Sequence, residues 1–171
     1  MRIVTLKHGL RSISLIFNQI CIILKKVLFV CLGNICRSPL GQGILQNKLE
    51  TLELDWETDS AGTAAYHVGQ KPDSRSIDIA KENGIDISMQ KARQFRSSDF
   101  IDFDHILVMD NSNYNNVISM AQNPHDKNKV ETLLSYGTAE IKEVPDPYYE
   151  GGFDYVFDLI ENAIDDFISK H

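Results

Sequence analysis

The chain has 171 residues, of which 43% are hydrophobic, and its formal net charge at pH 7 is -7. This length fits one domain, and this hydrophobic content can build a core without disorder or disulfide bridges. Nucleic acids and anionic membrane surfaces attract basic patches, so the acidic balance argues against both as stable partners. Any anion that the protein binds must therefore be held by a local arrangement of backbone N–H groups and an arginine.

Residues 1–25 are treated as an N-terminal extension of uncertain status, separate from a domain at 26–171. The apolar run at 13–24 is interrupted by polar residues and is too short to span a membrane. Lys25-Lys26 follow where a signal peptide would have small residues before its cleavage site. An accessory segment and an upstream start codon assigned in error remain as alternatives, and the sequence does not separate them.

From residue 26 onward, the pattern predicts strands that alternate with helices. Residues 27–30 form a continuous apolar run, as in a strand buried on both faces of a parallel sheet. A helix is predicted after it, with Pro39 at its first position, where proline is well tolerated. A weaker strand is predicted at 56–59, and a turn is predicted at 60–63.

The second half of the chain continues this alternation. Asp73 is predicted to cap a helix that stops at Asn83-Gly84. Two more strands are predicted at 106–109 and 141–144, and a long amphipathic helix is predicted at 153–168. Such alternation implies right-handed crossovers between parallel strands. The expected fold class is therefore α/β, a three-layer sandwich with a four-stranded parallel sheet and helices on both faces.

The loop between the first strand and the first helix is the most informative segment about function. Five residues separate Cys31, at the strand end, from Arg37, at the helix start. A loop of this length can curl so that successive N–H groups point inward above the positive end of the helix dipole. Arg37 can close this ring with a planar fork onto two phosphate oxygens. The residues expected to form or support the ring are Leu32, Gly33, Asn34, Ile35, Cys36 and Ser38.

Cys31 is the expected nucleophile of this loop. Thiols at helix N-termini or beside cations ionise more readily than a free cysteine, so Cys31 should be a thiolate aimed at phosphorus. Ser38 can donate its hydroxyl to the sulfur, which helps the thiol to ionise and later to leave. An inert buried thiol is the alternative, but strand, spacing, arginine, hydroxyl and proline all coincide here.

The chain has three cysteines, and this small odd number argues against a secreted disulfide framework. There is no Cys-x-x-Cys pair and the five histidines are scattered, so we expect no metal and no cofactor. A reducing, cytoplasmic compartment is expected. Cys36 has two alternative roles: it could trap an oxidised Cys31 as a disulfide, or it could simply pack beneath the loop.

These features resemble the low-molecular-weight protein tyrosine phosphatases, whose signature is a Cys-x5-Arg-Ser loop near the N-terminus. The resemblance runs from residue 26 to 171, and the extension lies outside it. It includes DSAGT at 59–63, Pro72-Asp73, ARQ at 92–94, VMD at 108–110 and DPYY at 146–149. It implies hydrolysis of phosphotyrosine in proteins through a cysteinyl-phosphate, by a monomer or weak dimer.

The resemblance also assigns roles outside the loop. Asp146, fixed between two prolines, matches the family's general acid, which protonates the leaving phenolate and then activates water. Tyr148 and Tyr149 match aromatic residues that flank the phosphotyrosine ring at the entrance. Tyr66 stands where the family often has another aromatic rim residue.

Some residues depart from the family pattern. Gln42 stands where a glutamate is common, and Gln90 where a histidine often helps to hold the loop asparagine. Both changes could loosen the support of the loop. Protein arginine phosphatases of the same family usually carry threonine at the position of Ile35, so Ile35 favours an aryl substrate.

Three other classes of protein fit less well. Thioredoxin-coupled arsenate reductases need two further cysteines downstream, but none follows Cys36. A nucleotide-binding module would need a Gly-x-Gly-x-x-Gly or Walker loop, which is absent. A phosphotyrosine-binding protein without activity would have no need to keep Cys31, Arg37 and Asp146.

Overall fold

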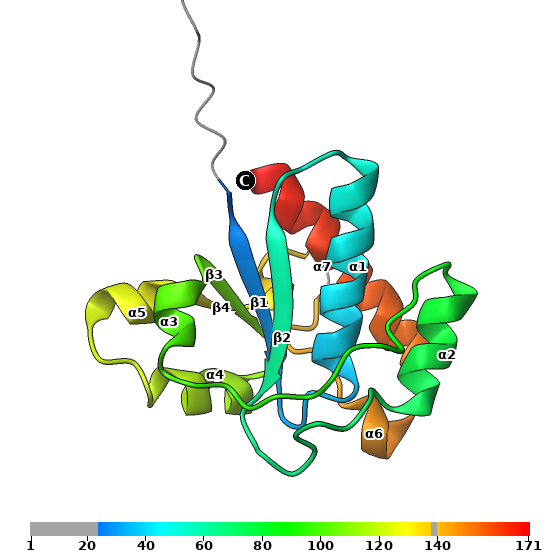
Figure 1. Cartoon of the computed structure of the whole chain (residues 1–171), viewed down its shortest axis with the longest axis horizontal. Helices are drawn as coiled ribbons and strands as arrows, with labels where there is room; N and C mark the ends of the chain where they lie inside the picture. Colours follow the sequence, from blue (N-terminus) through cyan, green and yellow to red (C-terminus); the bar gives the residue numbers. More distant parts are fainter. Residues whose placement is uncertain (1–23, 138–139) are drawn as a thin grey trace, which may run out of the picture.

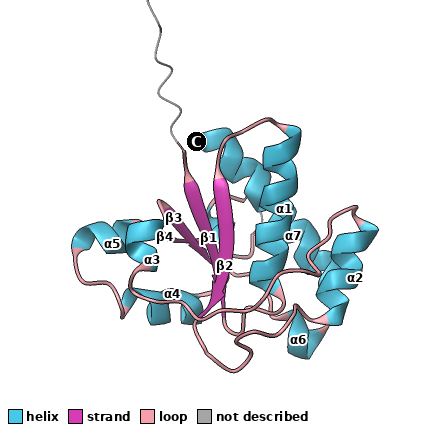
Figure 2. Ribbon diagram, viewed as in Figure 1, coloured by secondary structure: helices cyan, strands magenta, loops and turns pink. Residues whose placement is uncertain are grey.

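The computed structural model describes residues 24–137 and 140–171. A parallel sheet forms the middle layer, with helices on both sides (Figures 1 and 2). Its order is β2-β1-β3-β4, and every pairing is parallel. The strands are β1 Lys26–Cys31, β2 Glu57–Gly62, β3 His105–Val108 and β4 Val130–Thr132. The predicted α/β sandwich is therefore confirmed, and the carboxyl ends of all these strands lie at one edge of the sheet.

Two groups of helices cover the two faces of the sheet (Figure 1). One face is covered by α1 Arg37–Thr51 and α7 Phe153–Lys170, and α2 Ser74–Glu82 packs against these two helices. On the other side lie α3 Asp99–Asp102, α4 Asn111–Ile118 and α5 Pro124–Asn128. The short helix α6 Pro147–Glu150 and the 3-10 turn η1 Leu133–Ser135 lie in connections.

The central strand β1 is buried on both faces, as its continuous apolar run predicts. Val27 and Phe29 point into the core shared with α1 and α7, whereas Leu28 and Val30 point into the core shared with α3 and α4. Helix α1 packs directly on this strand, since a Cβ at Gly41 would lie 2.6 Å from the Phe29 ring. This close contact fixes the start of α1 next to the end of β1, where the candidate loop lies.

The boundaries of two predicted elements are confirmed in part. Asp73 caps α2 through its carboxylate, which accepts a bond from the Arg75 N–H, and Asn83 follows the last helical residue. Helix α1, however, begins at Arg37, so Pro39 is its third residue rather than its first. Proline is tolerated there because the N–H groups of the first helical turn have no partner within the helix.

One strand prediction and one turn prediction were wrong. The fourth strand is Val130–Thr132 and not 141–144, where Ile141 is exposed and the Val144 N–H donates to the Met109 carbonyl oxygen at 2.8 Å. A three-residue strand with a central glutamate gives no recognisable apolar pattern. The predicted turn at 60–63 is also largely strand, because β2 continues to Gly62 beside the end of β1.

The expectations for residues 1–25 concern a segment of which the structure describes only Leu24 and Lys25. Within residues 24–137 and 140–171, no helix is both long enough and apolar enough to cross a membrane.

Candidate active site

The loop from Cys31 to Arg37 lies at the carboxyl edge of the sheet, between the end of β1 and the start of α1. Asn34 has a φ of 56°, in the left-handed region that asparagine tolerates better than most residues. Gly33 passes close to His67, since a Cβ on this glycine would lie 2.9 Å from the imidazole Cδ2. The loop therefore curls tightly against the segment that follows β2.

Two hydrogen-bonding groups lie next to the buried sulfur of Cys31. The hydroxyl of Ser38 is 3.1 Å from Sγ, and the backbone N–H of Asn34 donates to Sγ at 3.3 Å. Ser38 lies in the first turn of α1, so the sulfur also faces the positive end of that helix. All of these groups favour negative charge on the sulfur.

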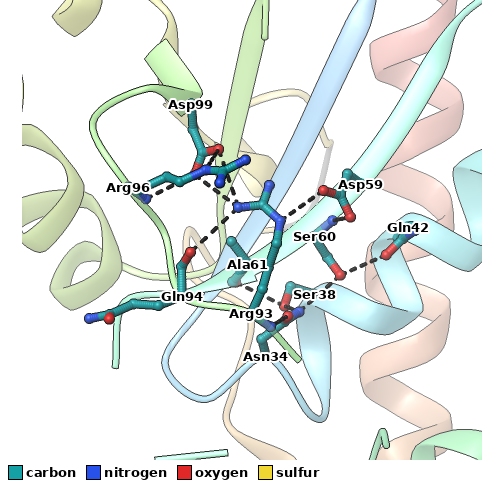
Figure 3. Close-up of polar contacts among 10 residues, drawn as sticks. All are labelled: Asn34, Ser38, Gln42, Asp59, Ser60, Ala61, Arg93, Gln94, Arg96 and Asp99. Carbon is teal, nitrogen blue, oxygen red and sulfur yellow. Dashed lines mark hydrogen bonds and ion pairs between the residues drawn. The ribbon is translucent and has the colours of Figure 1, made fainter. Parts of the chain in front are cut away.

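Asn34 is the centre of a buried polar network behind the loop (Figure 3). Its amide Nδ2 donates to Ser38 Oγ and to Ser60 Oγ, each at 2.9 Å, and its Oδ1 accepts from the Arg93 N–H at 2.9 Å. The Ser60 hydroxyl donates to Gln42 Oε1 at 2.7 Å. Gln42 therefore supports the network, although it differs from the glutamate that is common in the family.

Gln90 does not reach this network. Its Nε2 donates to the Pro39 carbonyl oxygen at 3.3 Å, and its buried Oε1 has no hydrogen-bond partner among the described residues. The support that a histidine at this position often gives to the loop asparagine is therefore not provided by Gln90.

The guanidinium group of Arg37 is held from two sides. Its Nη1 donates to Asp110 Oδ2 at 2.7 Å and to the Val144 carbonyl oxygen at 3.0 Å, and its Nη2 donates to Asp146 Oδ2 at 2.8 Å. These three bonds use three of the five N–H donors of an arginine. Nε–H and one hydrogen of Nη2 have no partner within the described part of the chain, and together they can form a fork for two phosphate oxygens.

Arg37 is buried, yet it remains firmly charged. Burial is the largest single influence and lowers its pKa, but the neighbouring charges of Cys31, Asp146 and Asp110 outweigh it, so the pKa of Arg37 is raised overall. The structure thus places a permanent cation beside the sulfur at the base of the pocket.

The pocket above the loop brings together residues that are far apart in the sequence. Tyr66 and Tyr149 are largely exposed at its mouth, and the rings of Tyr148 and Tyr149 meet edge to face with centroids 5.0 Å apart. Asp146 Oδ1 accepts a bond from the Tyr148 N–H at 3.1 Å, which orients the carboxylate. The lining residues are Cys31, Leu32, Gly33, Ile35, Cys36, Arg37, Tyr66, His67, Asp146, Tyr148 and Tyr149.

A family model described as low molecular weight phosphotyrosine protein phosphatase matches residues 26–170. The chain belongs to this family. Its members are hydrolases. The match covers all the strands and helices described above and the loop from Cys31 to Arg37. The first 25 residues lie outside the match.

Individual relatives agree with this assignment. A Synechocystis protein named as a candidate low molecular weight protein-tyrosine-phosphatase is 44% identical, over 81% of this chain and 90% of its own. The protein tyrosine phosphatase of Entamoeba histolytica is 40% identical, with a TM-score of 0.81 over 85% of this chain and 96% of its own. A Drosophila arginine phosphatase is 36% identical, with a TM-score of 0.80 over the same shares of the two chains.

Most residues that the sequence singled out in this phosphatase lie in or directly behind the pocket. Among the residues predicted to form the loop, the catalytic group or the rim, only Asn34 and Ser38 do not line it, because both are buried beneath the loop. Sequence reasoning missed the contact between Asp110 and Arg37, although Asp110 follows a strand at the carboxyl edge of a parallel sheet, where binding sites gather. It also missed His67, and no pattern in the sequence pointed to it.

Within the described residues, no group of three or more histidine, cysteine, aspartate or glutamate side chains could hold a metal ion.

Proposed function

We propose that this phosphatase hydrolyses phosphotyrosine in proteins through a cysteinyl-phosphate intermediate. The observation that carries the proposal is the meeting of Cys31, Arg37 and Asp146 in one pocket, from three separate parts of the chain. In this proposal Cys31 is the nucleophile, Arg37 binds the phosphoryl group, and Asp146 is the general acid and then the general base.

In the first step, the Cys31 thiolate attacks phosphorus opposite the tyrosyl oxygen. An S–P bond forms, the P–O bond to tyrosine breaks, and Asp146 gives its proton to the departing phenolate oxygen. The free donors of Arg37 and the inward N–H groups of the loop bind the phosphoryl oxygens. Most of the catalysis then comes from positioning and from charge stabilisation.

In the second step, Asp146 accepts a proton from a water molecule whose oxygen attacks phosphorus. The S–P bond breaks, inorganic phosphate forms, and Cys31 leaves as a thiolate. Ser38 Oγ at 3.1 Å and the Asn34 N–H at 3.3 Å stabilise that leaving sulfur. The same contacts therefore serve the attacking and the leaving thiolate.

The rim of the pocket favours an aryl substrate. Tyr66, Tyr148 and Tyr149 can flank a phenyl ring, and Leu32 and Ile35 add apolar wall on the way to the sulfur. The similarity to the Drosophila arginine phosphatase supports phosphoarginine as the second candidate. A phosphoguanidinium group, however, would have to lie against the apolar side chain of Ile35.

Phosphotyrosine peptides are expected to be hydrolysed faster than matched phosphoserine or phosphoarginine peptides. The expected ratio of kcat/KM is at least about tenfold, the discrimination that a few pocket contacts supply. Phosphate release from three peptides of otherwise identical sequence measures it. Faster release from the phosphoarginine peptide would assign the protein to the arginine phosphatases. If none of the three peptides releases phosphate, the proposed activity on them is excluded.

We also propose that Cys31 is sensitive to oxidation and that Cys36 protects it. Both thiols are free and line the same pocket. Burial raises the pKa of the Cys36 thiol to about 12, and the nearby charge of Asp73 acts in the same direction. Cys36 is thus protonated, so peroxide would oxidise Cys31 first, to a sulfenic acid, and Cys36 must lose its proton before its sulfur attacks. Cys36 sulfur can then bond to Cys31 sulfur, while its proton and the sulfenic hydroxyl leave as water.

The variant Cys36→Ser is expected to lose activity irreversibly at lower peroxide exposure than the unmodified protein. The unmodified protein should regain most activity after dithiothreitol reduces its disulfide, because the disulfide blocks further oxidation of Cys31. Activity is measured before peroxide, after peroxide and after reduction, and mass spectrometry tests for the Cys31–Cys36 link. Equal recovery of both proteins without that link would leave Cys36 with a packing role alone.

We further propose that the protein acts in the reducing cytoplasm, as a monomer or weak dimer without nucleic acid. The net charge of -7 supports the last point, since it repels polyanions.

A further inference from the structure

Arg93 lies behind the loop and not in the pocket, and its guanidinium group joins two carboxylates (Figure 3). Its Nε donates to Asp59 Oδ2 at 2.8 Å, and its Nη1 donates to both oxygens of Asp99 at 3.2 and 3.0 Å. Asp99 has no solvent exposure, so its charge depends on Arg93 and on the Arg96 N–H, which donates to it at 2.9 Å. We call Arg93, Asp59 and Asp99 the Arg93 clamp.

The Arg93 clamp fixes two backbone positions next to Asn34. The N–H of Arg93 itself donates to Asn34 Oδ1 at 2.9 Å. On the other side, Asp59 Oδ1 accepts the Ser60 N–H at 2.8 Å, and the hydroxyl of Ser60 accepts from Asn34 Nδ2. The clamp therefore holds groups that contact both ends of the Asn34 amide.

The direction of the hydrogen bonds follows from this arrangement. A backbone N–H can only donate, so Asn34 Oδ1 must face Arg93 and the Asn34 NH₂ group must face the two serine hydroxyls. Ser38 Oγ accepts from that NH₂ group, which leaves its own proton for Cys31 Sγ at 3.1 Å or the Ala61 carbonyl oxygen at 3.3 Å. A charged sulfur is the stronger acceptor, so the proton is directed at Cys31.

We propose that Arg93 is a positioning residue for the nucleophile. Through its clamp, Arg93 sets the orientation of the Asn34 amide, and the amide in turn aims the Ser38 hydroxyl at the sulfur. The inference rests on the proposed role of Cys31. According to this inference, the Arg93 clamp stabilises the loop although it contacts neither the substrate nor the sulfur.

The variants Arg93→Lys and Asp59→Asn test this inference. Lysine has one compact ammonium group in place of the planar fork by which Arg93 reaches Asp59 through Nε and Asp99 through Nη1, so it cannot reproduce both contacts with the same geometry. An asparagine at position 59 has one oxygen, so it must lose its bond to either the Ser60 N–H or Arg93 Nε. The side chain of Asp59 is 42% exposed, and this variant leaves the buried Arg93–Asp99 pair in place, so it should fold. The matched control is Arg96→Ala, because Arg96 Nε is 3.6 Å from the same Asp99 and its side chain is 68% exposed.

The deciding measurement is the rate at which iodoacetamide alkylates Cys31 as a function of pH, with the modified peptide located by mass spectrometry. In both clamp variants the midpoint of this curve should move to higher pH. Their kcat/KM should fall by about tenfold or more, the effect of losing one hydrogen bond to a charged group, with a larger change in kcat than in KM. Arg37, Cys36, Asp146 and His67, which also face the pocket, are unchanged in every variant, so the shift reports on the clamp.

The control Arg96→Ala should keep the curve of the unmodified protein. A folded Asp59→Asn protein with that same curve and unchanged kcat would overturn the inference, whatever the outcome for Arg93→Lys. Alkylation needs no turnover, so this result is distinguishable from a failure of the proposed phosphatase chemistry, which would appear as absent hydrolysis by the unmodified protein.

Discussion

Replacement of Cys31 by serine is expected to abolish hydrolysis of phosphate monoesters. A serine hydroxyl stays protonated at neutral pH, and the hydrogen-bond partners of this position within the described residues, the Ser38 hydroxyl and the Asn34 N–H, are not bases that could remove its proton. The covalent route is then closed, and we expect a loss of about 10⁴-fold or more. Turnover of p-nitrophenyl phosphate by purified Cys31→Ser protein measures this loss.

Binding of inorganic phosphate by Cys31→Ser serves as the control. It should remain largely intact, because the backbone N–H groups of the loop and the two free donors of Arg37 do not depend on the sulfur. Titration calorimetry with phosphate separates loss of chemistry from loss of the site. More than a trace of turnover by a protein that still binds phosphate would show that Cys31 is not the nucleophile.

The second large effect is expected at Asp146. Asp146→Ala should lower kcat by about 10²–10⁴-fold for phosphotyrosine, whose leaving group needs a proton, and by less for p-nitrophenyl phosphate. The bond from the Tyr148 N–H and the ion pair with Arg37 hold this carboxylate at the pocket, where a leaving oxygen would receive its proton. The measurement is kcat for the two substrates under identical conditions.

A nearby carboxylate provides the comparison. Glu150 lies in the same short helix α6 but does not line the pocket, so Glu150→Ala should keep nearly full activity towards both substrates. An equal loss with both substrates in Asp146→Ala would contradict a general acid and would indicate a role in binding or folding.

The loop could be predicted from the sequence because its determinants are neighbours along the chain. The buried strand, Cys31, Arg37 and the following helix occupy one continuous segment, and hydrophobic pattern and spacing are enough to order them. The partners of Arg37 were not predictable in the same way. Asp110 and Val144 lie 73 and 107 residues from it, and only the folded sheet edge brings them together.

The fourth strand shows where the pattern of apolar residues fails to predict a strand. Val130–Thr132 is short and lies at the sheet edge, so it needs few apolar residues and leaves little trace in the sequence. The segment 141–144 has the better pattern but runs up to Pro145, which has no N–H to donate to a neighbouring strand. This segment contributes to the candidate active site instead, because the Val144 carbonyl oxygen accepts a hydrogen bond from Arg37.

The three bonds that hold Arg37 have a consequence for affinity. A free arginine side chain carries about 2 kcal/mol of rotamer entropy, which a flexible binding site would lose each time an anion arrives. In this protein Asp110, Val144 and Asp146 immobilise the guanidinium group during folding, before any encounter with substrate. The interaction energy between a protein substrate and the pocket rim can then contribute to substrate specificity and to stabilisation of the transition state. None of it is needed to order the arginine.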